Sequence, residues 1–234
     1  MTLATFSRAR DISADVGWLA VLRVAPQWLV CRRYLGLSAD LDDAVLERPQ
    51  RPEVRVAPLD SRDVVALSAV DHTLTREEVI RRLDEGQQCT LGWWGHELAH
   101  VRWDSTAAAY LPYLGLSLRP GCADQVVVGI YTKPAFRGHG VAGAVMMEAA
   151  RRARAAGVTR LVWVAAWWNT RSLALARQTA SRIEGTVGYW TLGPWRRYFA
   201  SGGIRIAQDA SFSIDRRLAA ARSTPRDSCA KRQC

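Results

Sequence analysis

The chain has 234 residues, of which 49% are hydrophobic and 23% are charged, so it is long enough for one full domain with a sizeable core. This composition excludes a chain that is disordered over most of its length, and no apolar run approaches the roughly 20 residues that span a bilayer. The net charge of +10 indicates either a well-solvated basic surface or a polyanionic partner, such as a phosphate-rich cofactor or nucleic acid.

Cysteine and histidine usage argues against a disulfide framework and against a metal centre. The five cysteines are an odd number, are widely spaced and include no C-x-x-C pair. His96 and His100 have the i, i+4 spacing that chelates a metal on a helix, but the surrounding sequence is typical of a hairpin. Asp11 and Asp15 lie where a signal peptide carries only positive charge. We therefore expect a cytoplasmic protein without a bound metal.

Residues 1–52 are expected to form an N-terminal appendage and a linker. Residues 16–30 are apolar around much of their circumference and predict a helix that bends or ends near Pro26. This helix either packs on the main domain or lies on a membrane surface, although its polar face is not notably basic. Residues 33–37 predict a short strand, and an acidic cluster then leads into a linker that contains prolines.

The main domain is expected over residues 53–204, with a basic tail over residues 205–234. Hydrophobic periodicity and turn signals predict a strand, two helices, three strands, a helix, a strand, a helix and two strands. The expected ranges are 54–56, 61–70, 75–83, 89–94, 98–103, 125–131, 141–156, 160–166, 172–179, 187–191 and 195–199. This order fits a mixed α/β sheet with helices on both faces.

The turn before the helix at 141–156 carries the clearest functional signal. It consists of Arg137, Gly138, His139, Gly140, Val141 and Ala142. Backbone N–H groups at a helix N-terminus, together with the helix dipole, form a site for phosphate or pyrophosphate, and the two glycines let a ligand approach the backbone. Arg137 adds a cation that can pair with phosphate oxygens. The spacing is neither a Walker A loop nor a dinucleotide fingerprint.

The pattern Arg-x-x-Gly-x-Ala at residues 137–142 resembles the acyl-CoA signature, Q/R-x-x-G-x-G/A, of the GNAT acyltransferase superfamily. Residues 132–136 are similar to that family's strand-to-helix lead-in, and Asn169 is similar to the asparagine at the start of its fourth helix. The likeness in element order covers residues 53–199. It implies a mostly antiparallel sheet that is splayed at its middle, and an enzyme that transfers an acyl group, most simply acetyl, from CoA to an amine of a small molecule or peptide.

The resemblance also implies which residues hold the donor. The pantetheine arm would lie along the edge of the splayed strand, where one amide would stabilise the oxyanion. Amides of residues 137–142 would hold the pyrophosphate, and Asn169 would contact the pantetheine or support the opening between the strands. The residues implied for acyl-CoA binding are therefore Ile130, Tyr131, Thr132, Arg137, Gly138, His139, Gly140, Val141, Ala142 and Asn169.

The base that deprotonates the acceptor amine is one open assignment. Asp124 lies thirteen residues before Arg137, where some histone-acetylating members of the family carry a glutamate base. Glu97, His100 and Asp104 are competing candidates. We take Asp124 as the expected base.

The acid that protonates the leaving thiolate is the second open assignment. Many family members have a tyrosine seven residues after the asparagine, but here that position is Ala176. Tyr131, Ser172, Tyr189 or water could supply the proton, or the thiolate could leave unassisted. We take Tyr131 and Ser172 as the expected catalytic groups.

Two further interpretations remain open. The high charge, Ala176 and the arginine-rich residues 216–232 are compatible with the same fold using an aminoacyl-tRNA or a carrier-protein thioester as donor. The unassigned acid and base are also compatible with a non-enzymatic acyl-CoA-binding module. The ten tryptophans favour sheet packing and an aromatic-lined pocket for a flat acyl group, an aromatic acceptor or stacked bases. The sequence is also compatible with a homodimer.

Overall fold

The structure, a computed structural model, describes residues 31–41, 53–60, 63–64, 66–67, 74–179, 181–192 and 195–216. The helix expected over residues 16–30 lies outside these residues, as does most of the helix expected over residues 61–70. In the described part of the chain, no helix is long and apolar enough to cross a membrane.

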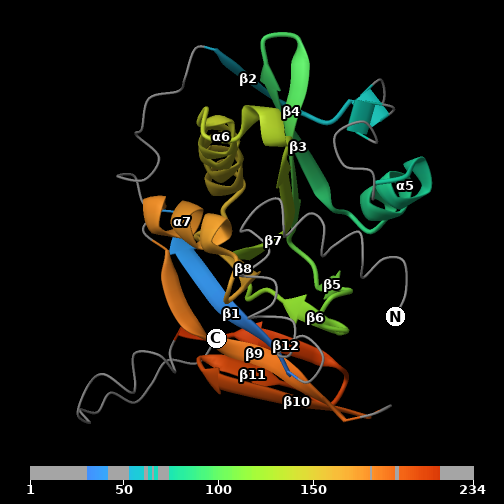
Figure 1. Ribbon diagram of the computed structural model, residues 1–234, viewed down its shortest axis with the longest axis vertical. Coiled ribbons are helices and arrows are strands. Elements are labelled where there is room, and N and C mark those ends of the chain that lie inside the picture. The colour runs from blue at the N-terminus through green and yellow to red at the C-terminus, as the bar shows by residue number, and fades with distance from the viewer. Residues whose placement is uncertain are drawn as a thin grey trace.

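Among the described residues, the main sheet has eight strands in the order β10-β9-β1-β8-β7-β4-β3-β2 (Figure 1). The strands are Cys31–Asp40 (β1), Val54–Pro58 (β2), Gln88–Trp94 (β3), Glu97–Ser105 (β4), Asp124–Thr132 (β7), Arg160–Ala166 (β8), Arg182–Leu192 (β9) and Trp195–Gly202 (β10). Each neighbouring pair is antiparallel except β7 and β8, which are parallel. The predicted mixed, mostly antiparallel sheet is therefore confirmed.

Three described helices cover the two faces of this sheet. The helices are Arg76–Asp84 (α5), Val141–Ala155 (α6) and Thr170–Gln178 (α7). Ala150 of α6 and Ala176 of α7 belong to one buried cluster with Trp163 of β8, whereas Val79 of α5 packs with Trp103 of β4 in another. Figure 1 shows α6 and α7 on one side of the molecule and α5 on the other. The helices thus lie where their predicted apolar faces can be buried.

Strand β1 corrects the expectation that residues 1–52 form an appendage. It lies between β8 and β9, and it pairs with β8 from Tyr34 to Asp40. Tyr34 is buried on one face of the sheet, and Leu37 is buried beneath the helices on the other. A strand that is buried on both faces lacks the polar–apolar alternation of a half-exposed strand, so its central position left no clear signal in the sequence.

A second, smaller sheet corrects the expected basic tail. Its order is β11-β12-β6-β5, with β5 at Ala109–Leu111, β6 at Leu116–Arg119, β11 at Ile204–Ile206 and β12 at Ser211–Ile214. Phe212 of β12 and Leu118 of β6 pack in one cluster with Val126 of β7 and Val162 of β8. Residues 205–214 therefore belong to a folded layer that covers the main sheet, because their apolar side chains complete that core.

The splay in the main sheet is confirmed at the junction of β7 and β8. The two strands pair only from Asp124 to Val126 and from Arg160 to Val162. Beyond this point β7 continues along β4, and β8 continues along β1. The register of β7 against β4 also shifts at Val128, which lies between the paired residues Val127 and Gly129. The parting leaves one edge of β7 without a strand partner.

Candidate active site

The first cavity, of about 430 Å³, lies where β7 and β8 part. Strand β7 contributes its residues from Val127 to Ile130, and β8 contributes its residues from Trp163 to Ala166. The start of β1 and the first turns of α7 close the cavity, with Met146 of α6. It therefore runs along the unpaired edge of β7.

The second cavity, of about 400 Å³, is bordered by α5, by β4 and by the β5–β6 hairpin. Tyr113, Val128, Gly129 and Ile130 line both cavities. Two molecules that enter from different sides can thus meet at the same stretch of β7. Such an arrangement suits a transfer reaction in a ternary complex, in which proximity and orientation lower the barrier.

The glycine-rich turn adopts a conformation that most residues avoid. Gly138 and Gly140 have φ angles of 83° and 82°, and Gly140 is the N-cap of α6. No atom of the described residues lies within 4 Å of a Cβ built at Gly138, so this part of the chain leaves the turn open to a ligand. The first hydrogen bond of α6 runs from Ala144 N to Gly140 O, so the earlier N–H groups have no acceptor within the helix.

The side chains of this turn have distinct environments. Arg137 folds back and donates from Nε to the carbonyl of Thr132, with an N···O distance of 3.1 Å. His139 is exposed and forms an edge contact with Trp94. Val141 is buried in the core, and Ala142 is half-buried. The turn lines neither cavity, so phosphates bound to it would lie on the surface beyond the end of β7.

The three predicted residues at the end of β7 do not all face the same space. Ile130 lines both cavities, whereas Tyr131 lines only the second. Thr132 lines neither of them; its Oγ1 lies 2.7 Å from Nδ1 of His100. The strand edge predicted for the donor thus separates the two cavities.

Asn169 and Ser172 are brought together at the start of α7, and both line the first cavity. Asn169 is the N-cap of α7, and its Oδ1 accepts a hydrogen bond from Ser172 N at 3.1 Å. Ala176, one turn further along, also lines this cavity. The predicted contact of Asn169 with the donor remains a prediction, but its place beside the cavity is compatible with it.

Asp124 lies away from the place where a base would act. Its carboxylate accepts hydrogen bonds from Nε and Nη2 of Arg160, at 2.9 and 2.5 Å. It also accepts from the backbone of Gly121, and it lines neither cavity. Because Asp124 lies at the paired beginning of β7, rather than at the parted end, we do not retain it as the base.

The competing candidates for the base also line neither cavity. Asp104 is buried, and both of its oxygens accept hydrogen bonds from Arg102. Glu97 is exposed at the end of the β3–β4 hairpin. His100 is 1% exposed, and burial together with the charge of Arg102 lowers its pKa to about 3. A neutral, enclosed imidazole helps to hold the end of β7, but it cannot reach an acceptor amine.

Tyr113, in the loop between β5 and β6, lines both cavities and was not among the predicted site residues. Its ring lies 5.1 Å from that of Tyr34, centroid to centroid. Two further tyrosines hold its loop, because Tyr189 donates to the carbonyl of Tyr113 and Tyr198 donates to the carbonyl of Leu114. The loop lies in a connector without periodicity, so the sequence carried no signal that it reaches the centre of the molecule.

Comparison with known proteins supports the class of fold that this geometry indicates. Residues 68–180 match the family model described as the acetyltransferase (GNAT) family. Over these residues, just under half of the chain, the sequence is similar to the GNAT acetyltransferase family. Strands β1, β2 and β9 to β12 lie outside the matched segment. No curated protein matches this sequence.

Two solved structures share the fold. A GNAT-family protein from Novosphingobium aromaticivorans has a TM-score of 0.50 and 16% identity, over 68% of this chain and 62% of its own. A conserved protein of unknown function from Staphylococcus epidermidis has a TM-score of 0.50 and 11% identity, over 72% of this chain and 64% of its own. The chain thus spans less than two thirds of either relative, and the likeness concerns the fold alone.

The buried His100 predicts a stability that falls in acid. Because its pKa in the folded protein is about 3, against an ordinary value of 6.5, the unfolded chain binds one more proton between these values. The free energy of unfolding should therefore fall as the pH decreases from about 6.5 to 4, by up to about 1.4 kcal/mol per pH unit from this residue.

This dependence can be measured by urea unfolding at several pH values. His100→Leu should flatten the slope in this range, whatever its stability at pH 7. His96→Leu, which changes an exposed histidine in the β3–β4 turn, is the matched control and should keep the slope of the wild type. Equal slopes for the two variants would contradict the assignment.

Proposed function

We propose that the protein is an N-acyltransferase that moves an acyl group, most simply acetyl, from acyl-CoA to an amine of a small molecule or peptide. The observation that carries this proposal is the meeting of two cavities at residues 128–130, on the strand that leads to the glycine-rich turn. The family match supports acetyl transfer as the chemistry.

The chain offers donor-binding groups of two kinds, and both fit acyl-CoA. The positive-φ glycines and the free amides at the start of α6 suit the pyrophosphate. The unpaired edge of β7 suits the pantetheine amides, which can add to it as an extra strand does. The thioester supplies an activated acyl group. In this arrangement the acyl group lies near Gly129 and Ile130, where both cavities open.

In this proposal the acceptor amine loses its proton in the second cavity. Glu78 and Glu85 are the carboxylates among its described lining residues, and both lie on α5. Hydrogen bonds from Arg81 lower the pKa of Glu78, which makes this carboxylate a weak base. We infer that the amine loses its proton to water at this rim rather than to a dedicated buried base.

Proton transfer to the leaving thiolate is assigned to Tyr113. The earlier candidates Tyr131 and Ser172 each line one cavity, whereas Tyr113 lines both. Ala176 is small and buried at the helical position where the family pattern places a tyrosine. A phenol that enters from the β5–β6 loop supplies the same chemistry from the opposite layer.

A substitution at Gly140 tests the donor site. Gly140→Asp should weaken CoA binding by tenfold or more, because its carboxylate would lie against the phosphates; this is about 1.4 kcal/mol of repulsion. Gly140→Asn is the matched control, since it imposes a similar side chain at the same positive φ without the charge. Calorimetry with CoA gives the affinities, and thermal unfolding checks the fold. Equal affinities for the two variants would count against the phosphate site.

A substitution at Tyr113 tests the acid. Tyr113→Phe should lower kcat about 10- to 100-fold, with little change in KM for acetyl-CoA, because the ring and its stacking on Tyr34 are kept. Tyr198→Phe is the control, because it removes a hydroxyl that holds the same loop without lining either cavity. Release of free thiol gives the rates. A similar loss in both variants would assign a structural role to Tyr113.

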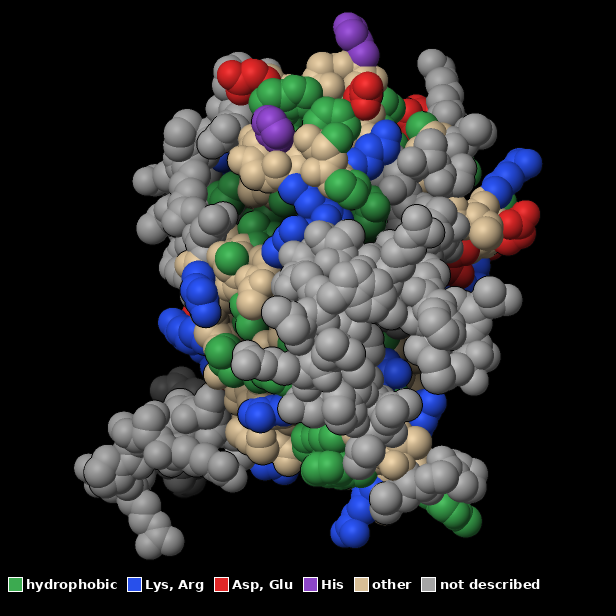
Figure 2. All heavy atoms as spheres, in the orientation of Figure 1, with side chains coloured by type: hydrophobic (Ala, Val, Ile, Leu, Met, Phe, Trp, Pro, Cys, Tyr) green, Lys and Arg blue, Asp and Glu red, His purple; other side chains and the backbone are tan. Residues whose placement is uncertain are grey.

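One observation favours the alternative of an RNA-linked donor. Strands β1, β9 and β10 present aromatic and basic side chains together: Trp190 is 46% exposed, pairs with Arg197 and lies 6.1 Å from the ring of Phe199. The exposed Arg33 is paired with Gly188 beside them and also lines the first cavity. Stacking aromatics among arginines suit single-stranded nucleic acid. Lys and Arg side chains are also spread widely over the face in Figure 2.

This alternative predicts binding of tRNA that weakens with salt. Trp190→Ala should reduce the affinity about tenfold, since stacking on one base contributes roughly 1–3 kcal/mol. Arg55→Gln, an exposed arginine at the opposite edge of the sheet, is the control and should change little. Mobility shift at two salt concentrations measures the effect. Absence of salt-sensitive binding would remove the alternative.

A further inference from the structure

The guanidinium group of Arg82 lies beside the place where the two cavities meet. Gly129 lines both cavities, and apart from its chain neighbours the described residues place a single atom within 4 Å of a Cβ built there. That atom is Nη1 of Arg82, at 4.0 Å. Because Gly129 has no side chain, the two cavities are in contact at this residue. Arg82 lies next to Gly129 on the side of the second cavity.

Arg82 is held in this position from two directions. Its Nε donates to Oε1 of Glu78 at 2.7 Å, across one turn of α5. Its guanidinium lies over the ring of Trp103, 5.3 Å from the centroid. Only 20% of the side chain is exposed. Nε is engaged by Glu78, and Nη1 lies next to Gly129, so Nη1 faces the part of the second cavity beside Gly129.

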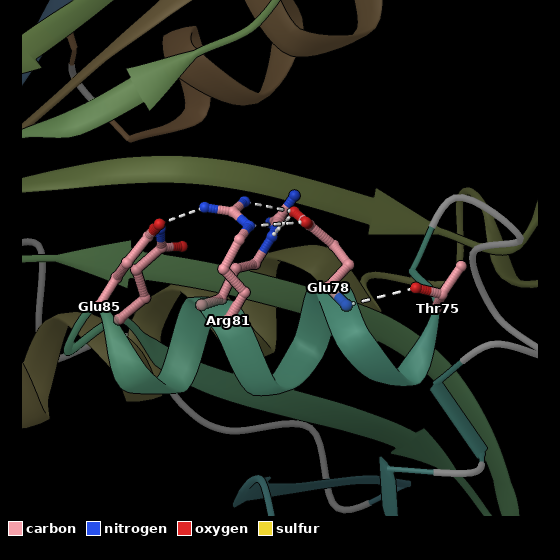
Figure 3. A network of polar contacts seen from close by, with 6 residues as sticks. Thr75, Glu78, Arg81 and Glu85 are labelled. Carbon is pink, nitrogen blue, oxygen red and sulfur yellow. Dashed lines mark hydrogen bonds and ion pairs between the residues drawn. The ribbon is translucent and has the colours of Figure 1, made fainter.

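The charges around Arg82 leave it incompletely neutralised. Glu78 is shared, because Arg81 donates to its two oxygens at 2.8 and 3.0 Å. Arg81 also pairs with Glu85, and both of these side chains are about half exposed at the rim. Figure 3 shows Glu78, Arg81 and Glu85 aligned along one side of α5. Among the described residues, Arg81 pairs with both Glu78 and Glu85, whereas Arg82 pairs with the shared Glu78.

The remaining walls of the second cavity are mostly aromatic and apolar. Trp103 lies beside Arg82. The other aromatic and apolar lining residues are Tyr110, Tyr113, Tyr131, Leu74, Val101, Leu111, Pro112, Val128 and Ile130. An acceptor here has room for a flat or apolar group next to a single inner positive charge.

We propose that the acceptor is an α-amino acid, or a molecule with the same head group, that carries an aromatic or apolar side chain. Arg82 binds its carboxylate through the Nη groups, and this places the neighbouring amine at Gly129. The aromatic walls hold the side chain. This inference rests on the proposed acyl transfer and names the substrate class for it.

The transfer balances without any further reactant. The neutral amine forms a C–N bond to the acyl carbon while the C–S bond breaks, and the electron pair of that bond leaves on sulfur. The amine loses one proton to water, and the thiolate gains one. The product keeps the carboxylate, so it should stay bound to Arg82 with a similar contact.

Matched acceptors test the role of the carboxylate. Phenylalanine, leucine and tryptophan are each compared with their amides, which keep the side chain and the amine but lack the negative charge. In the wild type, kcat/KM for at least one amino acid should exceed that for its amide tenfold or more. Arg82→Gln should lower kcat/KM for that amino acid about 10- to 150-fold and change that for the amide less than about threefold.

Two further variants keep this test sharp. Arg82→Lys keeps the charge but loses the fork of donors, so it should retain part of the preference. Arg76→Gln, an exposed residue at the start of the same helix that lines neither cavity, is the control and should behave as the wild type. Equal losses on amino acids and amides in Arg82→Gln would overturn the proposal and place Arg82 in the chemical step instead.

Binding without turnover separates this inference from the proposed function. N-acetylphenylalanine and N-acetylphenylalaninamide are titrated into the protein by calorimetry, which needs no reaction. Tighter binding of the carboxylate form, lost in Arg82→Gln, would support the site even if no acceptor were turned over. Equal binding of both forms, or binding of neither, would overturn it even if acyl transfer to other amines were observed.

Discussion

The site depends on the early separation of two parallel strands. Strands β7 and β8 share a ladder only as far as Val126 and Val162. Backbone N–H and C=O groups in a folded core require partners, so the edge of β7 that is freed there favours a ligand that can replace the missing strand. The gap stays open because each strand is anchored on its other side, β7 by β4 and β8 by β1.

That anchoring comes partly from segments outside the matched family region. Strand β1 lies between β8 and β9 in the main sheet. The small sheet packs on the face of the main sheet that carries Tyr34 of β1. Gly188 shows how closely the strands pack, since a Cβ at this position would lie 2.0 Å from the carbonyl of Arg32. The start of β1 therefore builds part of the wall of the first cavity, and β9 and β10 hold the loop that carries Tyr113.

The sequence predicted what is encoded locally and missed what depends on distant contacts. The strand at Arg160–Ala166 and the helix that begins at Val141 were predicted closely, because period and glycine signals mark them. The central place of β1 and the layer formed by β12 were missed, because pairing partners far apart in sequence decide them. Asp124 was chosen by spacing alone, which cannot reveal that Arg160 already holds its carboxylate.

Side chains from different layers of the fold lie close to one glycine, Gly129. Gly129 has no side chain, so groups from outside β7 can approach its backbone. Arg82 arrives from α5, and Tyr113 arrives from the small sheet. Ala176 on α7 leaves its own side of the first cavity open, so the acid need not come from that helix. The geometry at the parted strands is thus compatible with a general acid that comes from another element of the fold. Such an element must be held in place, as the hydrogen bonds from Tyr189 and Tyr198 hold this loop.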